Sequence, residues 1–251
     1  MQEMQEDRAP LKVTDIAVSY GGNKVLTGVS LEARHGFLGL IGPNGAGKTT
    51  LLNVISGYVR VDAGEVHIGA RRIGKLPPHR IARLGVSRTF QTPKLIHELT
   101  VLENVLLGID GRIPLLRPMP RSVTAHVRDV LGEFGLPPHQ RASDLPLATM
   151  KLVEVARAIA ANPIVMLLDE PAAGLSADEV ERLVAPLRRL VRTSQLAVVI
   201  IEHDLELITQ LCDRVAVLNF GKLIAEGAPG QVLKTPEVIH AYLGAQLAAV
   251  R

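Results

Sequence analysis

The sequence Gly42-Pro43-Asn44-Gly45-Ala46-Gly47-Lys48-Thr49-Thr50 follows a short apolar run, Phe37–Ile41, and opens a segment with helical character that ends at Gly57. It matches the pattern G-x-x-x-x-G-K-[ST] in full, with the strand before it and the helix after it that this pattern requires. Glycines let backbone N–H groups approach phosphate oxygens closely, and a helix N-terminus adds partial positive charge. The stretch predicts a phosphate-binding loop in an α/β fold, with Lys48 on the phosphates and Thr49 on Mg²⁺.

Two further apolar runs end in polar residues. Ile164–Leu168 is followed by Asp169 and Glu170, and Leu196–Ile201 is followed closely by His203. Unbroken apolar runs are typical of strands buried on both faces. An aspartate at a strand end can hold Mg²⁺, and the glutamate after it can polarise an attacking water. Taken alone, the carboxylates could also be an acidic strand cap, and a lone loop histidine is more often solvated than bound to phosphate.

The rest of the pattern indicates an α/β sheet with an antiparallel β segment near the N-terminus and an inserted helical subdomain. Residues 11–34 alternate apolar and polar side chains around Gly21-Gly22-Asn23, as a hairpin does. Glycine and proline interrupt short helical patterns over 77–141, with a proline-rich loop over 111–120, and a strongly amphipathic helix follows over 151–161. We expect one domain over 11–251, with an α/β core at 11–76 and 162–251 and a helical subdomain at 77–161. Further strands are expected at 65–68, 215–218 and 222–226, and further helices at 177–193, 205–212 and 229–247.

Composition narrows the class of protein. The chain has 251 residues, 47% hydrophobic and 21% charged, with a net charge of +3, which argues against disorder. It has a single cysteine, Cys212, so an intramolecular disulfide is excluded, and we expect an inert packed thiol. No apolar run approaches the ~18 residues of a membrane span, and the first ten residues are polar and acidic. We therefore expect a cytoplasmic protein with no membrane crossing of its own.

A basic stretch could suggest a nucleic-acid-binding surface. Such runs are more often a solvated face, and no aromatic residues interleave with this one, since the chain has only four Phe, three Tyr and no Trp. We therefore expect no nucleic-acid partner. The basic residues concerned are Arg71, Arg72, Lys75, Arg80, Arg83 and Arg88.

Together, these motifs resemble the ATP-binding subunits of ABC transporters. The resemblance implies Asp169 as a Mg²⁺ ligand, Glu170 as the catalytic base and His203 as the switch histidine. It also assigns Gln91, in SRTFQTPKL, to the position of a loop glutamine that contributes to catalysis and to Mg²⁺ binding. Tyr20 stands where the family has an aromatic residue that stacks on adenine. Without the resemblance, Gln91 would be interpreted as a surface amide and Tyr20 as a half-buried strand residue.

Longer stretches are similar to one subfamily, the Liv-G-like ATP-binding proteins of branched-chain amino-acid importers, whose relatives import urea or short amides. They are RTFQTPKLIHELTVLENVLLG, DEPAAGLSADE, IEHDLELI and LIAEGAPGQVL. The resemblance implies ATP and Mg²⁺ as cofactors and a position on the cytoplasmic side of the membrane. Permease subunits would contact the surface near 91–105, and a second ATP-binding subunit, identical or different, would complete the pair. A periplasmic or extracellular solute-binding protein would interact with this chain only indirectly. Compared with the subfamily, this chain has a shorter loop before the helical subdomain, at 108–122.

One segment departs from the family. The family's LSGGQ signature reaches across a dimer and caps the partner's γ-phosphate, but this chain has Leu145-Pro146-Leu147-Ala148-Thr149, ahead of a helix expected to begin near Met150. Pro146 removes a hydroxyl and an N–H donor, and Leu147 and Ala148 add side chains where glycines allow close approach. We hypothesise an asymmetric pair in which this chain hydrolyses ATP only when a different subunit supplies a working signature.

Three alternatives stay open from the sequence. The family could tolerate these signature changes, so that the chain acts as a homodimer. The chain could instead be a regulatory or non-transport ABC ATPase with weak hydrolysis, although such soluble ATPases usually carry paired cassettes or long coiled-coil insertions. Exporters and lipid-transport ATPases are a nearer alternative.

Overall fold

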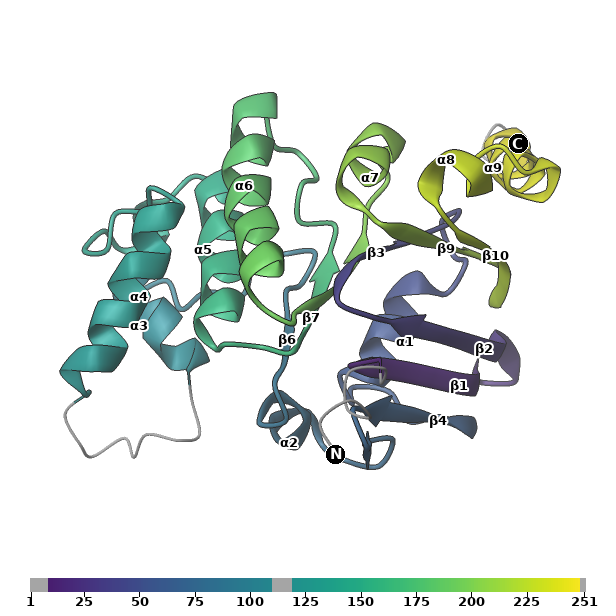
Figure 1. Cartoon of the computed structure of the whole chain (residues 1–251), viewed down its shortest axis with the longest axis horizontal. Helices are drawn as coiled ribbons and strands as arrows, with labels where there is room; N and C mark the ends of the chain where they lie inside the picture. Colours follow the sequence, from purple (N-terminus) through teal and green to yellow (C-terminus); the bar gives the residue numbers. More distant parts are fainter. Residues whose placement is uncertain (1–8, 110–118, 249–251) are drawn as a thin grey trace.

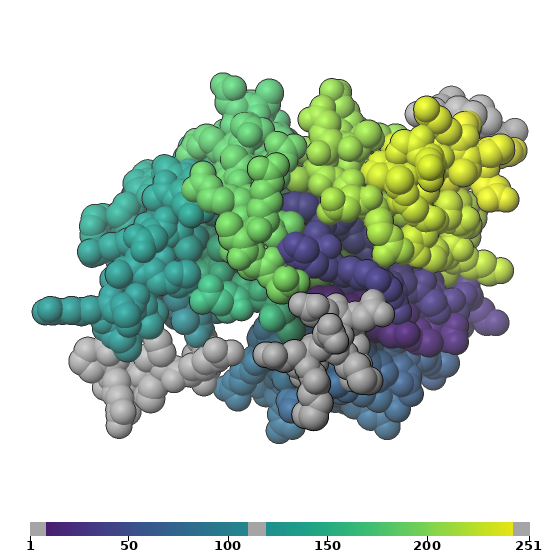
Figure 2. Space-filling model, viewed as in Figure 1, coloured from purple at the N-terminus to yellow at the C-terminus, as the bar shows by residue number. Residues whose placement is uncertain are grey.

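The computed structural model describes residues 9–109 and 119–248. The proline-rich loop predicted over 111–120 and the shortening predicted over 108–122 lie largely outside those residues. Figure 1 shows the helices between residues 101 and 160 at one end of the molecule and the N-terminal antiparallel strands at the other. In the space-filling view of Figure 2, these two ends are the teal and the purple-to-blue surfaces. No helix among the described residues is long and apolar enough to cross a membrane.

The central sheet contains six strands among the described residues, in the order β10-β9-β3-β8-β7-β6. All neighbours pair in parallel except β10, which is antiparallel to β9. Every residue of β3, β7 and β8 is buried, which explains their unbroken apolar sequences. The strands are β3 (Gly36–Ile41), β6 (Val86–Arg88), β7 (Val165–Asp169), β8 (Ala197–Ile201), β9 (Arg214–Asn219) and β10 (Lys222–Gly227).

The N-terminal strands form a separate antiparallel sheet, in which the described residues contribute four strands in the order β2-β1-β4-β5. The hairpin expected over 11–34 is confirmed, with Gly21 and Gly22 in the turn at φ of 54° and 90°. Both angles are in the left-handed region, where glycine carries no Cβ penalty. The strands are β1 (Leu11–Tyr20), β2 (Asn23–Ala33), β4 (Ala63–Ile68) and the short β5 (Arg71–Arg72), which the sequence analysis missed.

Two apolar cores lie on opposite faces of the central sheet, because successive strand residues point to opposite sides. Val199 and Ile201 face the core shared with the antiparallel sheet and with α1 (Lys48–Ile55), whereas Val198 and Ile200 face the remaining large helices. Helix α1 is therefore held between the two sheets. The other helices are α2 (Pro78–Ala82), α3 (Val101–Gly108), α4 (Arg121–Glu133), α5 (Leu147–Ala160), α6 (Ala177–Thr193), α7 (Leu205–Leu211), α8 (Pro229–Val232) and α9 (Pro236–Ala248), with a 3-10 turn at Ala142–Asp144.

Two elements differ from expectation. The stretch from Pro77 is not purely helical, because β6 pairs in parallel with β7 and joins the central sheet. Helix α5 begins at Leu147 rather than near Met150, so Leu147, Ala148 and Thr149 form its first turn. Pro146 is the N-cap, where its missing N–H breaks no helical hydrogen bond, and the leucine and alanine that follow it are strong helix formers. The residues expected in a loop before the helix are therefore part of it.

We predict that two glycines of the phosphate-binding loop tolerate alanine very differently. Gly42 and Gly45 both have positive φ, at 146° and 77°, so alanine is strained at either position. A Cβ on Gly42 would also collide with the carbonyl oxygen of Leu218 in β9, whereas a Cβ on Gly45 meets open space. Gly45→Ala should lower the free energy of unfolding by ~1 kcal/mol, and Gly42→Ala by at least ~2–3 kcal/mol, in urea titrations. Equal losses would contradict the close packing of the loop on β9.

We predict that the thiol of Cys212 is protected in the native protein. Cys212 is buried after α7, and burial, together with the nearby charge of Asp213, raises its pKa to about 12 from a usual value of 9.0. The thiolate is the reactive form, so its fraction at pH 8 falls by about a thousandfold. Labelling with a disulfide reagent at pH 8 should be at least ~1,000-fold slower in native than in urea-unfolded protein. Native labelling within tenfold of the unfolded rate would contradict the packing.

Candidate nucleotide-binding and catalytic site

The candidate site lies at the carboxyl edge of the central sheet, where neighbouring parallel strands end together. The loop 42–47 follows β3, residues 89–91 follow β6, Asp169 ends β7, and His203 comes two residues after β8. Parallel pairing places these four strand ends side by side, and open α/β sheets bind ligands at this edge.

The phosphate-binding loop holds its lysine close to its own backbone. The Lys48 Nζ donates to the carbonyl oxygens of Gly42, at 2.7 Å, and of Pro43, at 3.0 Å. Burial lowers the pKa of Lys48, while the charges of Glu170 and Asp169 raise it. The ammonium group and the carboxylates therefore lie within electrostatic reach of one another, although Lys48 begins α1 and the two carboxylates stand at the end of β7.

The start of α1 suits an anion. Gly47 is its N-cap, at a φ of 102°, and it has no side chain to cap the first N–H groups. Free N–H groups and the helix dipole attract negative charge at such a terminus. Thr49 is exposed on the first turn and Thr50 is half-buried, as is Pro43, while Asn44 is exposed and Ala46 is buried in the loop.

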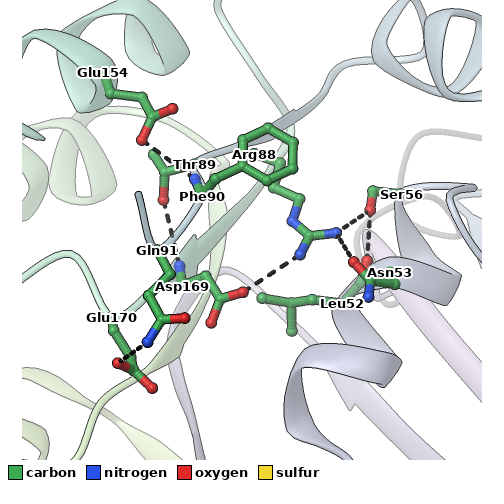
Figure 3. Close-up of polar contacts among 10 residues, drawn as sticks. All are labelled: Leu52, Asn53, Ser56, Arg88, Thr89, Phe90, Gln91, Glu154, Asp169 and Glu170. Carbon is green, nitrogen blue, oxygen red and sulfur yellow. Dashed lines mark hydrogen bonds and ion pairs between the residues drawn. The ribbon is translucent and has the colours of Figure 1, made fainter. Parts of the chain in front are cut away.

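Asp169 is held from two sides at the end of β7 (Figure 3). Its backbone N–H donates to Thr89 Oγ1 at 3.3 Å, and its Oδ2 lies 3.4 Å from Nη2 of Arg88. Burial raises the pKa of Asp169; Arg88 and Lys48 act against that rise, and Glu170 adds to it. The buried carboxyl group is thus flanked by two cations from different elements.

Glu170 lies at the centre of a polar cluster. Its Oε2 accepts a hydrogen bond from Gln91 Nε2 at 3.0 Å, and its Oε1 lies 2.8 Å from Nε2 of His203. Its backbone φ is 50°, in the left-handed region that non-glycine residues seldom adopt and that concentrates at functional sites. The sequence analysis singled out Gln91, Glu170 and His203 separately. The structure brings the side chains of Gln91 and His203 onto the carboxylate of Glu170.

A buried glutamate that the sequence analysis missed fixes the loop that carries Gln91. Glu154 on α5 is only 2% exposed and accepts from the backbone N–H groups of Phe90, at 3.2 Å, and Lys94, at 3.1 Å. Arg157 pairs with it at 3.2 Å. Burial raises the pKa of Glu154, and these hydrogen bonds act against that rise. The only available signal was a carboxylate among the apolar positions of a strongly periodic helix.

Two more buried charges hold the turn after Glu170. Lys151 on α5 donates through Nζ to the carbonyl oxygens of Glu170, at 3.3 Å, and Ala173, at 2.5 Å. Glu202, after β8, accepts from the backbone N–H of Ala172 at 2.7 Å, and burial raises its pKa. Lys151 closely follows the signature segment, and Glu202 directly precedes His203. The sequence spacing of these two residues gave no indication that they would contact the turn after Glu170.

Two predicted groups lie outside the contacts around Glu170. Tyr20 lies at the end of β1, beside the Gly21–Gly22 turn, and is 48% exposed. The signature segment leads into α5, with Leu145 buried, Pro146 at the N-cap and Leu147 61% exposed. The contact of Tyr20 with adenine stays a prediction.

The residues at this edge fit a Mg²⁺ ion that is shared with phosphates. The Thr49 hydroxyl is exposed at the start of α1, and Asp169 supplies a carboxylate; both are the hard oxygen ligands that Mg²⁺ prefers. Among the described residues, no group of three or more His, Cys, Asp or Glu side chains is placed to hold a metal ion. Mg²⁺ commonly takes its remaining ligands from substrate phosphates and water, which agrees with this sparse donor set.

Comparison with known proteins gives consistent results. Residues 26–173, more than half of the chain, match the family model described as ABC transporter. The chain is 34% identical to the high-affinity branched-chain amino acid transport ATP-binding protein BraF of Pseudomonas aeruginosa, over 94% of this chain and 98% of BraF. It is 35% identical to the corresponding LivG protein of Salmonella typhimurium, over 93% of this chain and 97% of LivG.

Solved structures are similar over nearly the whole fold. A nucleotide-free ATP-binding cassette from an ABC transporter superposes with a TM-score of 0.84 at 32% identity, covering 93% of this chain and 98% of that cassette. The ADP conformation of another structure, an ATP-binding cassette of an ABC transporter, also superposes with a TM-score of 0.84 at 32% identity. The match covers 94% of this chain and 99% of that cassette. The α/β fold expected from the sequence is therefore confirmed, and the chain belongs to the ATP-binding cassette family of ABC transporter ATPases.

Proposed function

We propose that this chain binds and hydrolyses ATP at the carboxyl edge of its central sheet and thereby energises a membrane importer. The observation that carries the proposal is the Glu170 carboxylate held between Gln91 and His203, within electrostatic reach of Lys48 in the phosphate-binding loop. The relatives named for branched-chain amino acid transport support that cargo, or related small amides.

Each residue has a distinct proposed role. The backbone of 42–47 and Lys48 bind the nucleotide phosphates, and Tyr20 contacts the adenine. Mg²⁺, held by Thr49 and Asp169 with Gln91 nearby, would neutralise phosphate charge. Glu170 accepts the proton of the attacking water as general base. His203 orients that carboxylate through their 2.8 Å contact and, by resemblance to the family, contacts the γ-phosphate.

Permease subunits are the proposed membrane partners, so the chain would lie peripherally on the cytoplasmic side of the membrane. The segment 91–105 proposed to contact them begins beside a pocket of about 290 Å³, whose lining includes Tyr58, Phe90 and Ile109. Three large apolar residues are about half exposed: Tyr58 lines this pocket, Ile96 lies within the segment 91–105, and Leu107 follows that segment on α3. Exposed apolar side chains on this segment and at the neighbouring pocket suit a partner segment better than they suit water.

A second ATP-binding subunit would complete the site. In α5 the first intrahelical hydrogen bond runs from Met150 N–H to Pro146 O, at 3.0 Å, so the N–H groups of residues 147–149 precede it. These backbone donors and the helix dipole remain available to a partner's phosphate. The signature therefore lacks the hydroxyl and the small side chains of the family's segment but keeps its helical start, which supports a weak capping surface and an asymmetric pair.

We predict that Lys48→Ala weakens ATP binding by at least ~10-fold, because an ammonium–phosphate hydrogen bond contributes roughly 1.5–3 kcal/mol. The measurement is titration of the purified chain with a fluorescent ATP analogue and Mg²⁺. Lys222→Ala removes an exposed lysine from β10 and is the matched control, which should bind as the wild type does. If Lys48→Ala also binds as the wild type does, the phosphate-binding role of the loop is wrong.

We predict that the altered signature limits hydrolysis by the lone chain. The triple change Pro146→Ser, Leu147→Gly and Ala148→Gly should raise steady-state ATP hydrolysis at high protein concentration by at least ~10-fold, since each restored hydrogen bond to phosphate contributes roughly 1.5–3 kcal/mol. Pro120→Ser makes the same change at the N-cap of α4 and should have no effect.

Two results decide this prediction. Adding Glu170→Gln to the triple variant should remove the gained turnover, which shows that the gain arises at the proposed site. Rapid, cooperative hydrolysis by the unmodified lone chain would show instead that the altered signature is tolerated, and the asymmetric pair would be wrong.

A further inference from the structure

Arg88 connects three elements behind the candidate site. It is the last residue of β6, and its side chain is only 7% exposed, so the solvated face expected for the basic stretch that begins at Arg71 is wrong for Arg88. Its Nη1 donates to Asn53 Oδ1 and to Ser56 Oγ, both at 2.7 Å, while its Nη2 lies 3.4 Å from Asp169 Oδ2 (Figure 3). One guanidinium group therefore links the end of α1 to the carboxylate proposed to bind Mg²⁺.

Two aromatic rings pack against the same guanidinium. The Arg88 Cζ lies 5.0 Å from the ring centre of Phe90 and 5.7 Å from that of Tyr58. The rings meet edge to face, with centres 5.8 Å apart. All three residues, with Ser56, line the pocket of about 290 Å³, and Tyr58 is 58% exposed. Arg88 thus has the pocket on one side and Asp169 on the other.

The orientation of Arg88 leaves a buried donor without an acceptor. Its Nε is buried and has no hydrogen-bond partner among the described residues. Such groups are rare in native proteins because burying an unpaired donor is unfavourable. The side chain instead directs two separate nitrogens, Nη1 and Nη2, at acceptors on different elements, a planar fork that the single nitrogen of a lysine ammonium does not reproduce.

We propose that Arg88 is a positioning residue that fixes the Asp169 carboxylate for Mg²⁺ and connects it to the wall of the neighbouring pocket. Arg88 holds Oδ2, so the carboxylate has one orientation before the metal arrives; residues that orient a metal ligand in this way commonly affect metal affinity 10–100-fold. A partner segment that moves Tyr58 or Phe90 would also move the guanidinium. The inference rests on the proposed Mg²⁺-dependent site. It adds Arg88 to the residues that act on Mg²⁺ binding, as a residue distinct from Gln91.

The test compares nucleotide binding with and without metal, using Mn²⁺ and a non-hydrolysable ATP analogue. For the wild type and each variant, the full chain is titrated in EDTA and in Mn²⁺, and the ratio of the two affinities measures the metal contribution. Bound Mn²⁺ is followed by electron paramagnetic resonance. Arg88→Met should lower the ratio by at least ~10-fold while leaving the affinity in EDTA within twofold, and Arg88→Lys should lower it by a smaller factor.

Matched variants separate positioning from folding. Arg83→Met makes the same change on the same pocket wall, at an exposed residue, and should leave the ratio unchanged. Tyr58→Ala removes one of the two rings and should lower the ratio by ~2–5-fold. Thermal unfolding of each variant identifies any that no longer folds, in which case Arg88→Lys carries the test.

Four outcomes would overturn the inference, the last of them together with the metal site on which it rests. An unchanged ratio in folded Arg88→Met removes the positioning role, and an unchanged ratio in Tyr58→Ala removes the connection to the pocket. A parallel loss of affinity with and without metal in Arg88→Met would assign the residue a structural role only. A wild-type protein whose nucleotide affinity ignores Mn²⁺ would instead overturn the proposed metal site itself, together with the inference that depends on it.

Discussion

Parallel pairing of β3, β8, β7 and β6 is the constraint on which the rest of the structure depends. These strands are buried between two apolar cores, so their order and register are set by packing on both faces. Polar residues can follow only where the strands emerge, at one edge of the sheet. The candidate site is a consequence of that arrangement: residues from Gly42 to His203 meet because four strands end together.

Helix α5 makes the site dependent on a second element. Its Glu154 holds the loop around Gln91, and its Lys151 holds the backbone at and after Glu170, so one helix fixes both Glu170 and one of the two side chains that contact its carboxylate. The same helix begins with the altered signature, which is proposed to face a partner subunit. The helix that begins at the altered signature therefore also fixes the surroundings of Gln91 and Glu170.

Sequence reasoning succeeded where local signals are strong. The glycine-rich loop, the apolar strands and the N-terminal hairpin carry their own patterns, and the resemblance singled out Gln91 and His203, which both contact Glu170 and whose catalytic roles stay predictions. It failed where tertiary contacts decide. The strand β6 is too short for a periodic pattern, and the start of α5 depends on Pro146 acting as N-cap. Arg88, Lys151 and Glu154 are charged residues whose burial follows only from the packing around them.

The central claim is that Glu170 of this chain supplies the base for the ATP hydrolysis that drives import. The most direct measurement is ATP hydrolysis and substrate uptake by the assembled transporter in lipid vesicles, with Glu170→Gln in this subunit alone. The account predicts that both rates fall together by at least ~100-fold, the usual scale for loss of a general base, while ATP still binds. Hydrolysis and uptake at the unmodified rates would contradict it, because another subunit or another residue would then perform the chemistry.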